Sequence, residues 1–253
     1  MPAEKEPHYF ATDMPVYRRM VEEEKYLALF SEATSAHNAI GEASVWYLYS
    51  DDALGKIRNF QPDARIMVFF RNPVDFVQSL HAQFAYNNGR DPDFLAAWKN
   101  PKSRDRLIKA GAFGTQFEKL RKLFAPEQRL VILQDDLKEA PRREYLRALE
   151  FLGLEDDGRT DFSTFNANKV HRSPGLARFA KRTPAPIDRA WRQAKRLLGI
   201  RQLGLMERIH KLNTKPVRRP GIPEQLRLEV HAAFADEIRS LGSQIQRDLS
   251  HWR

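Results

Sequence analysis

The feature that most constrains this chain is an apolar stretch that leads directly into a helix start. Residues 65–70 (RIMVFF) place five apolar side chains in a row, which is typical of a strand buried on both faces. An Arg-Asn-Pro sequence follows, in which Asn72 can cap a helix and Pro73 suits its first position. We therefore expect a strand–helix unit, with the helix running from Pro73 to about Tyr86.

The rest of the chain continues this alternation of strands and helices. Further strands are expected at 129–134, 8–11 and near 40–42. Helices are expected at 15–32, 51–60, 115–124, 141–152 (closed by Gly153), from 177 onward, and at 224–249. Strands that alternate with helices predict an α/β protein, with a parallel sheet flanked by helices and a helical C-terminal region.

Composition removes several classes of protein. Hydrophobic residues make up 42% of the 253 residues, which is enough for a core, so the chain is not disordered as a whole. Its apolar runs are far shorter than the roughly 20 residues of a membrane span, and the N-terminus has no apolar signal region. The absence of Cys excludes disulfides, thiol nucleophiles and Cys-based zinc sites. We expect a single domain over 1–253, located in the cytoplasm.

The net charge of +9 is concentrated in one segment. Residues 169–219 contain 15 Lys and Arg against two acidic residues, a net +13, so the remainder of the chain sums to −4. Such a segment should face an anion, which could be a phosphorylated cofactor, an acidic glycan, a membrane surface or nucleic acid. A helix around Trp191 would contact a membrane or an anionic acceptor, or it is simply a solvated basic face over a packed apolar stripe.

Two small groups of residues could carry chemistry. Arg71 ends the strand and Ser79 lies two turns into the following helix, a pairing that suits a phosphate at the carboxyl end of a parallel strand. The alternative is that Arg71 pairs with a neighbouring carboxylate and Ser79 only packs. Near the N-terminus, Glu6 and His8 could each act as a general base, unless they belong to a solvated chain end.

Several searches for known motifs find nothing. The chain has no Gly-rich GxxxxGK[ST] or GxGxxG loop and no Gly-x-Ser-x-Gly elbow. The seven His show no spacing typical of metal ligands, so we expect no metal.

Taken in order, segments spread over nearly the whole chain resemble the sulfotransferase family, and its bacterial branch related to the heparan sulfate sulfotransferases above all. The matching segments are KEPHYF at 5–10, GEASVWYLY at 41–49, RIMVFFRNPVDFVQSLHAQF at 65–84, GAFGTQFEKLRKLF at 111–124, LVILQDDL at 130–137, FLGL at 151–154, NANKVHRS at 166–173 and RDLSHW at 247–252. The resemblance implies a fold of the P-loop nucleotide-binding type.

The resemblance also implies a reaction and roles for individual residues. The family transfers a sulfuryl group from 3′-phosphoadenylyl sulfate (PAPS) to a hydroxyl or amine and releases adenosine 3′,5′-bisphosphate (PAP). By resemblance, Arg71 and Ser79 hold the 3′-phosphate of PAPS. Glu6 is then the catalytic base, with His8 beside it in the acceptor site. A carbohydrate or a small metabolite is the expected acceptor.

Two departures from the family pattern qualify this interpretation. The heparan enzymes carry a Lys where this chain has Ala43, which weakens the case for a heparan-like acceptor. The family also begins with a strand and a phosphate loop, and neither precedes the KEPHYF segment here. We therefore expect a domain that lacks this strand and phosphate loop, and a 253-residue chain that transfers little sulfate.

Other interpretations stay open. One is a catalytically incomplete remnant that binds nucleotide or an anionic glycan. A nucleic-acid-binding protein is a further alternative, but no recognition motif supports it, so we expect no nucleic-acid partner. Basic residues that could complete a nucleotide site form two pairs, Lys169 with Arg172 and Lys215 with Arg218.

Overall fold

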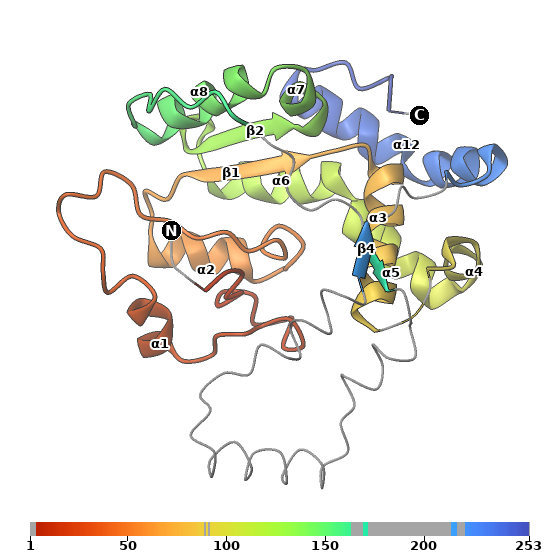
Figure 1. Cartoon of the computed structure of the whole chain (residues 1–253), viewed down its shortest axis with the longest axis horizontal. Coiled ribbons are helices and arrows are strands. Elements are labelled where there is room, and N and C mark those ends of the chain that lie inside the picture. Colours follow the sequence, from red (N-terminus) through yellow and green to blue (C-terminus); the bar gives the residue numbers. More distant parts are fainter. Residues whose placement is uncertain are drawn as a thin grey trace, which may run out of the picture. The chain divides into compact units, whose positions relative to one another are not determined.

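Two structural units interleave along the chain. In a computed structural model, residues 4–88, 90, 92–162, 169–171, 214–216 and 221–252 are described (Figure 1). Unit 1 is assembled from Met1–Phe76, Ile108–Phe162 and Leu228–Arg253, and unit 2 from Val77–Leu107 and Ser163–Arg227.

Unit 1 contains the parallel strand pair that the sequence predicted. Strand β1 (Ile66–Phe70) pairs directly with β2 (Arg129–Leu133) in parallel register, with Phe70 opposite Leu133. The carboxyl ends of both strands therefore meet at one edge of the sheet. Because ligands of parallel α/β sheets bind beyond that edge, the register fixes where the candidate site of Arg71 must lie.

Unit 1 also contains helices. They are α1 (Glu23–Ala28), α2 (Ala53–Phe60), α6 (Phe113–Leu123), the 3₁₀ turn η1 (Pro126–Gln128), α7 (Gln134–Glu139), α8 (Pro141–Leu152) and α12 (Glu224–Ile245), the last from Leu228 onward. The Phe70 ring of β1 contacts Phe113 and Phe117 of α6, with ring centroids 5.1 and 5.9 Å apart. Helix α8 ends as predicted, with Gly153 in the left-handed conformation at φ 70°.

The expectation that β1 is buried on both faces is wrong. Val68 and Phe70 are buried, whereas Met67 and Phe69 on the other face are 37% and 59% exposed. The apolar run alone could not reveal this, because a strand covered on one face can carry the same residue types as one covered on both.

The N-terminal part also differs from expectation. Residues 8–11 and 40–42 are not strands, and the helix expected at 15–32 is reduced to the single short helix α1. The backbone turns tightly instead, with Glu6 and His8 at positive φ and the Ala11 N–H donating to the His8 carbonyl. An aromatic cluster around Phe10 and Tyr26 holds this segment together in place of a backbone ladder.

Unit 2 takes over partway along α3 (Pro73–Asn87), at Val77. It continues with α4 (Phe94–Lys99) and α5 (Pro101–Gly111), the latter up to Leu107. It also contains the antiparallel pair β3 (Lys169–His171) and β4 (Thr214–Pro216). The helices expected from residue 177, including the one around Trp191, lie outside the described residues. Among the helices that are described, none combines the length and the apolar character that crossing a membrane requires.

Candidate functional site

The strand–helix junction after β1 forms as its sequence predicts. The Asn72 side chain accepts a hydrogen bond from the Val74 N–H at 2.9 Å, and its carbonyl accepts from the Phe76 N–H at 2.9 Å. Asn72 therefore caps α3, whose first residue is Pro73. The cap fixes the chain direction and leaves the Arg71 side chain at the carboxyl end of β1.

Arg71 is a partly buried cation with an unused donor. Its Nε atom is buried and has no hydrogen-bond partner among the described residues. Burial lowers the pKa of the Arg71 guanidinium, while the nearby carboxylates of Asp75 and Asp135 raise it. A buried donor without a partner costs about 1–3 kcal/mol, so an anion that accepts from Arg71 would recover that cost.

Ser79 lies farther along α3 and is partly buried. Arg71 belongs to unit 1 and Ser79 to unit 2. The neighbouring carboxylates of the alternative interpretation are those of Asp75 and Asp135, which act electrostatically on Arg71.

Glu6 and His8 lie side by side in unit 1. The Glu6 Oε2 atom is 3.5 Å from His8 Nε2, and the Glu6 side chain is 41% exposed. His8 is only 2% exposed, and its Nδ1 atom has no hydrogen-bond partner among the described residues. Burial lowers the pKa of His8, against the raising influence of Glu6, so the imidazole is neutral at pH 7. The pair is thus an accessible carboxylate against a buried neutral ring, not a freely solvated chain end.

A second carboxylate, which the sequence did not single out as a site residue, supports this pair. Glu42 accepts hydrogen bonds from the Ser44 hydroxyl at 2.8 Å and from the Tyr47 hydroxyl at 2.6 Å. The Ser44 hydroxyl oxygen in turn accepts from the His8 N–H at 3.1 Å. Burial raises the pKa of Glu42, and hydrogen bonds from Tyr47, Ser44 and Tyr26 oppose that rise. Glu42 and Ser44 lie in the GEASVWYLY segment, but no spacing rule links them to residues 36 positions earlier.

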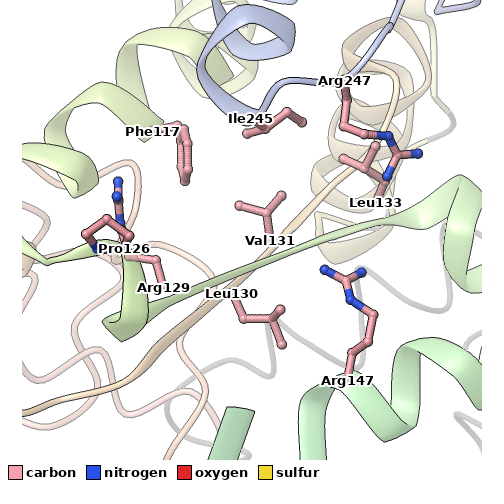
Figure 2. A pocket seen from close by; sticks show the side chains of 9 residues that line it. All are labelled: Phe117, Pro126, Arg129, Leu130, Val131, Leu133, Arg147, Ile245 and Arg247. Atoms are coloured by element: carbon pink, nitrogen blue, oxygen red, sulfur yellow. The ribbon is translucent and has the colours of Figure 1, made fainter. Parts of the chain in front are cut away.

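A cavity of about 290 Å³ lies in unit 1 along β2 (Figure 2). Its lining includes three arginines: Arg147 from α8, Arg247 from the chain after α12, and Arg129 at the start of β2. Two of them already have carboxylate partners, since Arg247 binds Asp136 through two contacts of 2.9 Å and Arg147 pairs with Glu144. The Nη1 atom of Arg129 is buried and, like the Nε atom of Arg71, has no hydrogen-bond partner among the described residues. Arg71, Ser79, Glu6 and His8 are absent from the lining residues.

The basic residues expected to complete a nucleotide site are only partly described. The strand pairing sets Lys169 opposite Pro216 and Val170 opposite Lys215. Arg172 and Arg218 lie outside the described residues. The part of the chain that is described contains no group of three or more His, Asp or Glu arranged to hold a metal ion.

Comparisons with known proteins bear on this geometry. Residues 52–176 match the sulfotransferase domain family, a stretch that includes β1, Arg71, Ser79 and β2 but not Glu6 or His8. Among solved structures, a sulfotransferase from Alicyclobacillus acidocaldarius matches with a TM-score of 0.68 and 23% identity, over 100% of this chain and 87% of that one. A search of curated proteins found no match.

The chain is thus similar to the sulfotransferase domain family over residues 52–176. The fold is the α/β fold of a sulfotransferase. The family match includes β1 and the helix start that follows it.

Proposed function

We propose that this chain transfers a sulfuryl group from PAPS to a hydroxyl or amine of an acceptor. The sulfotransferase match over 52–176 and the shared fold support a transferase of this kind. The observation that carries the proposal is Arg71, a cation at the carboxyl end of β1 whose buried Nε donor has no partner among the described residues. The branch related to heparan sulfate sulfotransferases remains an expectation from sequence resemblance.

The residues after β1 fit the 3′-phosphate of the donor. A guanidinium gives charge-assisted hydrogen bonds to phosphate oxygens, and the Ser79 hydroxyl can add another. A nucleotide without the 3′-phosphate would leave the Arg71 donor unsatisfied, so this site distinguishes PAP from adenosine 5′-phosphate. The donor, when bound, supplies a sulfuryl group on a good leaving group.

In this proposal Glu6 accepts the proton of the acceptor. The acceptor oxygen or nitrogen forms a bond to the sulfur of PAPS, while the bond between sulfur and the bridging oxygen breaks and PAP leaves. The acceptor proton passes to a base. The Glu6 carboxylate is exposed enough to reach that proton, and the neutral imidazole of His8 lies 3.5 Å from it. General-base catalysis of this type contributes about 10²–10⁴ in rate.

Calorimetry tests the phosphate assignment. Arg71→Ala should weaken PAP binding at least about tenfold, because a charge-assisted hydrogen bond contributes about 1.5–3 kcal/mol. Adenosine 5′-phosphate should bind the variant and the parent chain equally. Arg121→Ala, which removes an exposed arginine of α6, is the matched control and should leave PAP binding unchanged. Equal losses for both nucleotides would refute the assignment.

A second candidate function is nucleotide binding without transfer. The specific observation that favours it is the lack of a Gly-rich phosphate loop in the 253 residues. Each hydrogen-bond donor of such a loop that is aimed at charge developing in the transition state would stabilise that state by about 2.7–4 kcal/mol. Without these donors the chain would lose turnover but keep part of its affinity for the nucleotide. Assays of transfer from PAPS, run beside PAP calorimetry on the same protein, separate the two functions.

A further inference from the structure

Three hydroxyl groups of the N-terminal part of unit 1 converge on the carboxylate of Glu42. Its Oε2 atom accepts from the Ser44 hydroxyl at 2.8 Å, and its Oε1 atom accepts from the Tyr47 hydroxyl at 2.6 Å. The Tyr26 hydroxyl gives a third hydrogen bond to the same carboxylate. All three of these partners are neutral, so hydroxyl donors compensate the burial of this negative charge.

Two of these hydroxyls also bind the main chain near the proposed base. The Ser44 Oγ atom accepts from the His8 N–H at 3.1 Å, and the Tyr47 hydroxyl oxygen accepts from the Phe10 N–H at 3.4 Å. A hydroxyl has one proton, so a hydroxyl that donates it to a carboxylate offers only its lone pairs to other groups. The Glu42 carboxylate therefore orients both hydroxyls as acceptors for the N–H groups of His8 and Phe10.

The main chain held in this way has an unusual conformation. Glu6 and His8 have φ values of 57° and 49°, a region that residues other than glycine seldom adopt. Such a conformation persists only where surrounding contacts impose it. The His8 ring is also fixed by Tyr47, whose ring stands edge-on to it at 6.2 Å. The distance of 3.5 Å between Glu6 Oε2 and His8 Nε2 depends on this backbone geometry.

A separate set of hydrogen bonds fixes the residue between the pair. The Arg19 and Met20 N–H groups donate to the Pro7 carbonyl, at 3.1 and 3.0 Å. These bonds join two main-chain segments and do not involve Glu42. Removing the Glu42 carboxylate should therefore loosen the main chain at His8 without releasing the whole segment.

Glu42 is a costly side chain for a purely structural role. Burial favours its uncharged form and raises its pKa. An apolar side chain of similar volume would avoid the cost of burying a charge. A residue that lowers stability and yet contacts the supports of a candidate site is expected where stability is given up for function.

We propose that Glu42 is a positioning residue for the main chain that carries Glu6 and His8. It acts through the hydroxyls of Ser44 and Tyr47 and does not itself touch the acceptor. This inference rests on the proposed function, because it takes Glu6 as the base whose position matters.

Hydrogen exchange tests the positioning without requiring turnover. In Glu42→Gln an NH₂ group replaces one carboxylate oxygen, so one of the two hydroxyls loses its acceptor. The amide proton of His8 or of Phe10 should then exchange about three- to tenfold faster, as expected for the loss of one hydrogen bond. The Met20 amide proton should keep its exchange rate. Glu32→Gln, which changes an exposed carboxylate, is the control and should alter none of these rates.

Turnover and stability, measured on the same variants, separate positioning from a structural role. Glu42→Gln should lower turnover about 10–10²-fold, because a small displacement of a catalytic group has an effect of this size. PAP affinity should stay constant, and the urea unfolding midpoint at pH 7 should not fall. Ser44→Ala should also lower turnover. The double variant should lose less than the product of the two single losses, because Glu42 acts partly through Ser44.

The outcomes distinguish this inference from the proposed function. Unchanged exchange at both His8 and Phe10 would overturn the inference. So would an unchanged turnover of Glu42→Gln in a chain that transfers sulfate, a lower urea midpoint in that variant, or losses that multiply fully in the double variant. Faster exchange at His8 or Phe10 in a chain that transfers nothing from PAPS would uphold the positioning and refute the transferase.

Discussion

Two regions of unit 1 are built by different means. The sheet region, formed by β1 and β2 with α6, α8 and α12, relies on backbone pairing and regular helices. The N-terminal region, residues 4–64, contains only the short helices α1 and α2 among its described elements. It relies instead on hydrogen bonds between side chains, such as Tyr47 to Glu42, and on stacked rings, such as Tyr9 on Tyr26 at 4.4 Å.

The difference shows how each region positions its candidate residues. Arg71 is placed by strand register and a helix cap, features that belong to the backbone. Glu6 and His8 have positive φ, and contacts from distant segments hold them there. The Ser44 and Tyr47 side chains contact His8, and the Arg19 N–H donates to the carbonyl of Pro7, which lies between Glu6 and His8. The position of Arg71 should therefore tolerate changes in nearby side chains, whereas the positions of Glu6 and His8 should depend on the side chains that contact them.

The largest effect that would sharpen this contrast is expected at Glu6. Glu6→Gln preserves shape and should lower turnover by about 10²–10⁴ in a chain that transfers sulfate, because the acceptor proton then has no base. PAP affinity and the urea unfolding midpoint should stay constant. Glu4→Gln is the control carboxylate, since it is exposed and two residues away. Turnover within threefold of the parent would rule out Glu6 as the base.

A smaller effect, on stability alone, is expected at Gly114 in the sheet region. A Cβ atom there would lie 2.8 Å from the Glu237 carbonyl oxygen and 2.8 Å from the Ser240 Cβ atom, so α6 and α12 would have to separate. Gly114→Ala should therefore lower the free energy of unfolding by about 1–3 kcal/mol.

Gly55→Ala provides the matched control, because no atom lies within 4 Å of a Cβ atom at that position in α2. It should stabilise the protein by about 0.5–1 kcal/mol through helix propensity. Urea unfolding measures both variants. If they shifted stability in the same direction, the close approach of α6 and α12 would not be a determinant of the fold.

The smallest effect is expected at Glu42 and depends on pH. Burial raises the pKa of Glu42 above its ordinary value of 4.5, so the folded state binds this proton more tightly than the unfolded state. Its protonated form therefore stabilises the fold at low pH, and that contribution is lost as the pH rises from 4.5 through the folded pKa. Relative to the parent, Glu42→Gln should gain stability as the pH rises above 4.5.

Unfolding curves at several pH values, with Glu32→Gln as the exposed control, measure this difference. A parent-minus-variant difference that does not change with pH would mean that the Glu42 carboxylate is not perturbed by burial.

The sequence predicts the fold correctly where an element is determined by residues that are neighbours along the chain. The strand–cap–helix unit through Asn72 and Pro73, strand β2 and the Gly153 stop all depend on neighbouring residues, and all are confirmed. Helices α4 and α5 were missed although Asp93 and Asn100 cap them through 2.9 and 3.0 Å bonds, signals that were present but not used.

The predictions from sequence are wrong where contacts with distant residues determine the backbone conformation. Aromatic residues at 8–11 resembled a strand, but their rings pack onto Tyr26 and Tyr47, so the backbone turns instead. The position of Arg71 was predictable from the strand end. The residues themselves indicated Glu6 and His8 as possible bases, and the family resemblance gave them their roles. Glu42 could not be predicted as their support, because it reaches His8 only through Ser44, which lies 36 residues from His8 in the sequence.

The interleaving of the two units affects how the chain can fold and recombine. The polypeptide leaves unit 1 after Phe76, returns to it at Ile108, leaves it again after Phe162 and returns at Leu228. Neither unit is therefore formed from one continuous stretch of the chain. Contacts that join distant stretches raise the contact order, which slows folding because long loops must close before any stabilising contact forms. Gene fragments that end between the units would each encode an incomplete core, so exchange of a whole unit between related genes needs several coordinated crossovers.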